Sequence, residues 1–154
     1  MTATNHALTG AVVILALKEP VFALPLALIS HFVLDAIPHF GIHEDDVVKR
    51  NGHWLFRRVV GVDVVLVVCS LIIVPLIAQT HISGWWILAA MLLALAPDTV
   101  WIYRFIHEVR TKIARPHGRF ARFHQWIQWS EKPWGLAVET LWFGAMIVAA
   151  AILA

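Results

Sequence analysis

The feature that most constrains this chain is a series of five long apolar segments that contain very few charged side chains. They cover Thr4–Leu17, Val21–Ile37, Val59–Ala78, Trp85–Phe105 and Trp134–Ala154. A helix of about 20 residues, at 1.5 Å per residue, spans the roughly 30 Å hydrocarbon core of a bilayer. With 60% hydrophobic and only 14% charged residues, the composition excludes an ordinary soluble domain. We therefore predict a single all-α integral membrane domain, residues 1–154, built from about five transmembrane helices.

The basic residues are distributed unevenly among the connections between these segments. Of the 12 Lys and Arg residues, all except Lys18 lie in the two long connections, residues 41–58 and 104–133. If all five segments cross, both connections lie on the side of the amino terminus, and the positive-inside rule places that side in the cytoplasm. The net charge of +2 suits a membrane surface, so we expect membrane lipid as a partner and no nucleic acid.

A polar stripe interrupts the second apolar segment. His31, Asp35 and His39 recur at intervals of four residues, which on a helix returns to nearly the same face. Two imidazoles and a carboxylate are ligand types that suit zinc, or manganese and iron when more oxygens join. Pro38 disfavours helical geometry at Ile37, which places His39 close to the helix end. The alternative is an ordinary hydrogen-bonded His–Asp pair with His39 at the membrane surface.

Other ionisable residues fall at the same membrane level if the chain crosses five times. They lie near the cytoplasmic ends of the remaining apolar segments and are His6, Asp63, Asp98 and Glu139. Carboxylates at membrane depth are costly and normally face the bundle interior, where they pair with one another or with an ion. A bound divalent cation would resolve their mutual repulsion. The alternatives are pairing with arginines from the basic connection, or a proton or ion pathway.

The second long connection contains a short amphipathic pattern that begins at Gly118. Phe120, Phe123 and Ile127 recur at helical spacing, with Arg119 and Arg122 between them. This pattern predicts a helix lying in the cytoplasmic interface, with the two arginines available to a lipid phosphate.

His124 falls on the apolar side of the same predicted helix. From there its side chain could reach the inner ends of the transmembrane helices and act as a further metal ligand. A histidine in such a place also serves as a polar tip at the membrane interface, so both interpretations stay open.

Three short motifs resemble those of a known family. Asn5-His6-Ala7-Leu8-Thr9-Gly10, the run from His31 to His39, and Ala96-Pro97-Asp98 are similar to those of small bacterial inner-membrane proteins described as membrane-bound, metal-dependent hydrolases, the YdjM-like group. The resemblance implies a multi-pass protein of the inner membrane with metal positions at His6, His31, Asp35 and Asp98. The larger members carry a His-Arg-Gly-x-Thr-His run, which this chain replaces with His117-Gly118-Arg119-Phe120 followed by His124.

These observations predict a metal-dependent hydrolase as the first hypothesis. A metal held by His6, His31 and Asp35, completed by Asp98 or His124, would keep a position for water. Asp63 or Glu139 would then act as general base or orient a ligand. The depth of the site favours an ester or phosphodiester of a lipid as substrate. The competing hypothesis is a non-catalytic membrane protein with a structural ion or polar cluster, because no nucleophile motif such as Gly-x-Ser-x-Gly is present.

Overall fold

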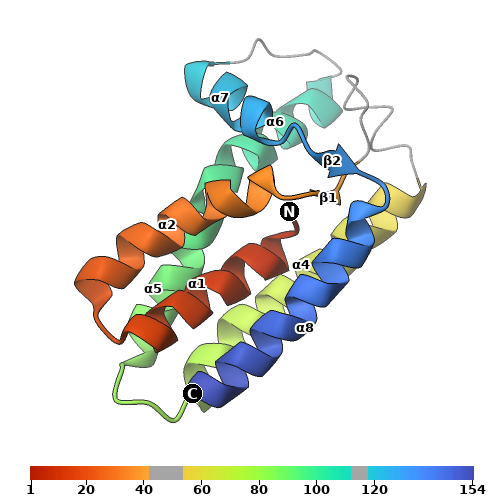
Figure 1. The fold of residues 1–154 in the computed structure, drawn as a ribbon. Helices are drawn as coiled ribbons and strands as arrows, with labels where there is room; N and C mark the ends of the chain where they lie inside the picture. Colours follow the sequence, from red (N-terminus) through yellow and green to blue (C-terminus); the bar gives the residue numbers. More distant parts are fainter. Residues whose placement is uncertain (42–53, 112–117) are drawn as a thin grey trace.

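The computed structural model describes residues 1–41, 54–111 and 118–154, and almost all of these residues are helical (Figure 1). The elements in chain order are α1 (Ala3–Leu17), α2 (Pro20–Ala36), β1 (His39–Phe40), α4 (Trp54–Ile77), α5 (Gly84–Leu95), η1 (Ala96–Asp98), α6 (Thr99–Thr111), α7 (Arg119–Ile127), β2 (Glu131–Lys132) and α8 (Gly135–Leu153). The predicted all-helical class is therefore confirmed.

Three helical stretches within the described residues are long and apolar enough to cross a membrane. They are Trp54–Ile77, Gly84–Glu108 and Gly135–Leu153. The first two helices are apolar but shorter: α1 has 15 residues and α2 has 17, which correspond to about 22 Å and 25 Å of helical rise. The prediction of a membrane bundle thus holds for three helices, and the crossing of α1 and α2 stays a prediction.

Helix α1 lies at the centre of the bundle (Figure 1). It packs against α2, α4, α5 and α8, and its side chains from Thr4 to Ala11 are all buried. Gly10 permits the closest of these approaches, because a Cβ atom there would lie 2.6 Å from the carbonyl oxygen of Ala90 on α5. Small residues at such positions allow helix backbones to approach closely where no hydrophobic effect drives association.

Proline residues and a left-handed residue set the boundaries of the first two helices. Lys18 ends α1 with φ of 59° and donates its backbone N–H to the carbonyl of Ile14. Pro20 then occupies the first position of α2, where its missing N–H costs nothing and its fixed φ suits a helix. The two helices therefore run back against each other as a tight pair.

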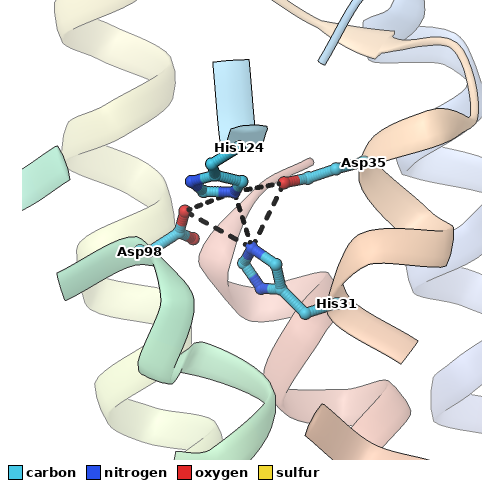
Figure 2. Close-up of side chains that lie close together, drawn as sticks. All are labelled: His31, Asp35, Asp98 and His124. Carbon is cyan, nitrogen blue, oxygen red and sulfur yellow. Dashed lines mark hydrogen bonds and ion pairs between the residues drawn. The ribbon is translucent and has the colours of Figure 1, made fainter. Parts of the chain in front are cut away.

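Ala96-Pro97-Asp98, which lies within the fourth apolar segment, forms the 3-10 turn η1. Pro97 has no N–H to donate, so the α-helical hydrogen-bond ladder cannot continue unchanged through it. The turn separates α5 from α6 and carries Asp98 toward α2 and α7, as Figure 2 shows.

A two-residue parallel pairing joins the end of α2 to the start of α8. His39 lies opposite Glu131, and Phe40 lies opposite Lys132. Gly135, the first residue of α8, packs directly on the backbone of His39, and a side chain at this position would collide with it. This contact brings the amino-terminal end of α8 close to the polar end of α2.

Candidate metal centre

Four side chains from three separate parts of the chain converge at one point inside the bundle (Figure 2). The group consists of His31, Asp35, Asp98 and His124, and each offers one ligand atom such that all four atoms lie within 4.8 Å of one another. His31 and Asp35 come from α2, Asp98 from η1 and His124 from α7. We call this set the His/Asp group.

The spacing within the His/Asp group is short and regular. Nε2 of His124 lies 2.8 Å from Oδ2 of Asp35 and 3.0 Å from Nε2 of His31. Nε2 of His31 lies 3.2 Å from the same Asp35 oxygen and 3.7 Å from Oδ1 of Asp98. The distance from His124 to Asp98 is 3.9 Å.

Burial isolates this group from water on most sides. The side chains of His31 and Asp35 are completely buried, and that of His124 is 6% exposed. Asp98 retains 22% of its surface, which makes its side of the group the accessible one. Two carboxylates in such surroundings require a balancing positive charge, from protons or from a cation.

The orientation of His31 is fixed by a backbone contact on its far side. Its Nδ1–H donates to the carbonyl oxygen of Ala94 at 2.7 Å, and this carbonyl lies in the last turn of α5. Because a carbonyl can only accept, Nδ1 carries the proton, and in the neutral ring Nε2 presents a lone pair to the group. Metal-binding histidines usually have this arrangement, in which the second ring nitrogen donates to a carbonyl or carboxylate.

Asp35 is held by several groups besides His31 and His124. Nε2 of His6 and the amino group of Met1 lie 3.1 Å and 2.5 Å from Oδ1, while the Gln128 amide donates to Oδ2 at 3.1 Å. His6 also stacks on His31 with ring centroids 4.0 Å apart. His6 therefore lies beside the His/Asp group and faces the oxygen of Asp35 that points away from His124.

Helix α7 carries His124 into the bundle through aromatic contacts. The ring of Phe32 on α2 lies 5.7 Å from Phe123, 6.1 Å from His124 and 6.4 Å from Phe120, measured between centroids. Such edge-on and tilted aromatic pairs stabilise the packing of two elements. The predicted amphipathic helix is thus present, and its histidine joins the group.

His39 is placed apart from the His/Asp group. It lies on β1, where its Nδ1–H donates to the carbonyl of Ile37 at 2.8 Å and Nε2 lies 3.9 Å from Glu131. The helix ends at Ala36, before Pro38, so the interval of four residues no longer returns His39 to the face of His31 and Asp35. Its expected role as a ligand does not follow from this geometry.

Asp63 and Glu139 also lie outside the group, and both hold the start of α1. Asp63 accepts the backbone N–H groups of Ala3 and Thr4, each at 2.9 Å. Glu139 accepts those of Thr2 at 3.1 Å and Phe40 at 3.0 Å. The first N–H groups of a helix have no partner within it, and negative charge is stabilised there. These contacts describe a capping role, so a catalytic role for either carboxylate stays a prediction.

Arg119 and Arg122 lie on the exposed surface of α7. They are on the same short helix as the buried His124, at its opposite, outward side. Neither is among the described ion pairs with the carboxylates of the bundle. The alternative expected from the sequence was that arginines of this connection neutralise the buried acids. Arg119 and Arg122 do not do so at the His/Asp group.

Three contributors were not identified from the sequence. Gln128 lies four residues after His124, so both reach the same face of α7, and this interval was a signal that could have indicated it. The Ala94 carbonyl and the Met1 amino group have no sequence signal, because any residue supplies a carbonyl and any chain an amino group. His117, from the run that was compared with the family motif, lies outside the described residues.

Comparison of the chain with protein-family models, with characterised proteins and with solved structures finds no match. Function is therefore inferred from the site itself. The described residues form a helical protein with three potential membrane spans and a buried His/Asp group that could hold a metal ion.

Proposed function

We propose that this chain is a multi-pass inner-membrane hydrolase whose His/Asp group binds a divalent metal ion, zinc first and manganese or iron as alternatives. Its proposed substrate is an ester or phosphodiester of a membrane lipid, attacked near the cytoplasmic headgroup level. The observation that carries the proposal is the convergence of two imidazole nitrogens and two carboxylate oxygens within 4.8 Å.

The spacing of the four atoms is compatible with the proposed ion. Ligands bound tetrahedrally at about 2.1 Å from zinc are about 3.4 Å from one another. Five of the six separations in the group, from 2.8 to 3.9 Å, lie around this value, and the sixth, between Asp35 and Asp98, is within 4.8 Å. The two carboxylates carry the charge that one divalent cation needs, and the Met1 ammonium, which also contacts Asp35, adds one positive charge beside the site.

Surrounding residues supply the orientation that a metal site needs. The Ala94 carbonyl oxygen lies 2.7 Å from Nδ1 of His31 and so holds the ring with Nε2 directed toward the group. Gln128 and His6 contact the two oxygens of Asp35 at 3.1 Å each. Partners of this kind fix ligand geometry and commonly contribute tenfold to a hundredfold in metal affinity.

The proposed reaction is hydrolysis at the accessible side of the group. When bound, the metal would supply Lewis acidity and make a water nucleophilic at neutral pH. Asp98 is the most exposed member at 22%, so water would approach along its side. Arg119 and Arg122, exposed on α7, would bind the phosphate of the lipid headgroup.

The proposed topology has five crossings, with the amino terminus and both long connections in the cytoplasm. α1 and α2 are shorter than a typical span, but α1 is surrounded by other helices and needs no direct match to the lipid. A reporter fused after Ala154 should be exported, and one inserted near Gly118 should stay cytoplasmic. Both reporters on one side of the membrane would contradict this topology.

The decisive experiment is elemental analysis of protein purified in detergent without chelator. We expect about one zinc, manganese or iron per chain, removed by chelator and restored by the same metal. The resemblance to the YdjM-like group is a further reason to measure metal first, since it implies metal positions at His6, His31, Asp35 and Asp98. A wild-type protein that stays metal-free after challenge with all three ions would rule out the hydrolase together with its metal.

A non-catalytic polar cluster is the second candidate function, and the contacts of Asp35 favour it. Within the described residues, five groups lie within hydrogen-bond distance of this carboxylate: His6, His31, His124, Gln128 and the Met1 amino group. A single proton on Nε2 of His124 would also satisfy both Asp35 and the His31 lone pair. Asp35 is therefore fully surrounded by donors without an ion, and elemental analysis separates the two functions.

A further inference from the structure

An apolar groove runs along the outside of the α1–α2 pair and beside α8. Its volume is about 490 Å³, within the range of about 300–1,000 Å³ that is usual for small-molecule sites. The walls include Val13 and Leu17 of α1, Leu26, Ile29 and Val33 of α2, and Trp142 of α8. Leu26, Ile29 and Val33 are 44%, 52% and 56% exposed, so the groove opens outward from the bundle.

The groove follows one helical stripe on each of two antiparallel helices. On α1 the lining residues begin at Thr9 and end at Leu17, and on α2 they begin at Leu26 and end at Leu34. Each stripe repeats at intervals of three and four residues and extends over about 12 Å of helical rise. A narrow channel of this length suits an extended hydrocarbon chain.

The lining offers very little hydrogen bonding to an occupant. The hydroxyl of Thr9 donates to the carbonyl of Asn5 at 2.8 Å, and that of Ser30 donates to Ala27 at 2.7 Å. The indole N–H of Trp142 donates to the Thr9 oxygen at 3.0 Å. Because these three polar groups already have partners, a polar ligand would gain little, whereas an alkyl chain would lose nothing.

At one end of the groove, the lining residues of both helices are close in sequence to residues in or beside the His/Asp group. On α2, Ser30 and Leu34 line the groove and directly precede His31 and Asp35. On α1, Thr9 lies three residues after His6, whose Nε2 is 3.1 Å from Asp35. The other end reaches Leu17 and Leu26, near the turn that joins α1 to α2.

We propose that this groove binds an acyl chain of the lipid substrate and so directs the ester or phosphodiester toward the His/Asp group. The inference rests on the proposed function, which it deepens by assigning the substrate class: a long-chain acyl lipid. Three observations carry it together: the apolar lining with its satisfied polar groups, the outward opening, and the position of Ser30 and Leu34 one residue before His31 and Asp35 on α2.

Photochemical labelling tests the groove directly. The probe is phosphatidylglycerol with a diazirine in one acyl chain, mixed into vesicles that contain the full-length protein. After illumination, mass spectrometry locates the adducts. We expect labelling of the stripes 9–17 and 26–34 to exceed that of equally exposed residues on α4 by about tenfold.

Two matched variants distinguish a site from general contact with lipid. Ala16 lines the groove and is exposed, so Ala16→Trp should fill it and abolish the excess labelling. Val65 on α4 is 61% exposed and lies outside the groove, so Val65→Trp should leave the labelling pattern unchanged. Far-ultraviolet circular dichroism checks that both variants fold.

The outcomes separate this inference from the proposed function. Labelling spread evenly over all exposed apolar residues, or unchanged in Ala16→Trp, would overturn the acyl-chain site while leaving the metal measurement untouched. No excess labelling of these stripes in a wild-type protein that runs as a dimer in detergent would overturn it in favour of a second copy of the chain. Elemental analysis of the same samples tests the metal independently, because Ala16→Trp should retain as much metal as the wild type.

Discussion

Two pairs of carboxylates lie within the helical bundle, and their surroundings differ. Asp63 and Glu139 accept backbone N–H groups at the start of α1, at distances of 2.9 to 3.1 Å. Asp35 and Asp98 instead face the imidazoles of His31 and His124. The first pair binds the partial positive charge of a helix end, and the second pair lies where ligand atoms converge.

This difference shows that membrane depth alone does not identify a functional carboxylate. A helix end offers several N–H donors and the positive end of its dipole, which can stabilise a buried anion without any ion. Asp35 and Asp98 face imidazoles and not a helix end, and the ammonium of Met1, which contacts Asp35, offsets only one of their two negative charges. The remaining charge needs a proton or a metal, and this requirement makes the second pair the candidate site.

The sharpest test of the comparison is metal binding by charge-removing variants of both pairs. Asp98→Asn and His31→Ala should reduce bound metal from about one per chain to near zero, since each removes a ligand from a small set. Asp63→Asn serves as the matched control and should retain the metal. Elemental analysis after gel filtration measures all three. Equal metal content in Asp98→Asn and Asp63→Asn would erase the distinction between the pairs.

For thermal stability we expect the larger effect at Asp63, which should not affect metal binding. Asp63→Ala removes the acceptor for two backbone N–H groups and for the Thr4 hydroxyl at 2.6 Å. Leaving these donors without a partner should lower the free energy of unfolding by about 2 kcal/mol. Thermal denaturation in detergent, followed by circular dichroism, measures the loss. A variant as stable as the wild type would show that Asp63 does not cap α1.

Gln128 tests whether neighbours of the His/Asp group matter for the metal. Gln128→Ala removes the amide that donates to Asp35 at 3.1 Å, and metal affinity should fall about tenfold. Gln125 lies on the same helix but is exposed, so Gln125→Ala should leave the affinity unchanged. Competition with a metal-binding dye gives both constants. Identical values for the two variants would place Gln128 outside the site.

The smallest expected effect concerns the lipid surface. Arg119→Gln and Arg122→Gln should each weaken binding of α7 to anionic lipid by about 1 kcal/mol and flatten its salt dependence. Detergent-solubilised protein titrated with nanodiscs of anionic or neutral lipid measures this. If both variants bind anionic nanodiscs as tightly as the wild type does, α7 does not bind lipid phosphate, and its role is to pack on α2 and position His124.

How much was predictable depends on whether the information is local. The apolar segments, the break at Ala96–Asp98 and the amphipathic helix that begins after Gly118 follow from local composition and from Pro97, and the structure contains them. The pairing of His31 with Asp35 also follows from a spacing of four residues along one helix. Each of these features depends on neighbours in the sequence, which is why the pattern sufficed.

Which of the ionisable residues join the His/Asp group depends on contacts between distant parts of the chain. His6, His39, Asp63 and Glu139 belong to the same residue types as the final group, and spacing could not separate them from Asp98 and His124. Only the packing of α7 on α2 brought His124 to Asp35, and only the position of the α1 amino terminus gave Asp63 and Glu139 their N–H partners. The sequence alone determined which residues could not remain in lipid without a partner, because burying charge is costly wherever it occurs. The tertiary structure decided which partner each received, because hydrogen bonds and metal ligation act over about 3 Å and depend on where separate helices meet.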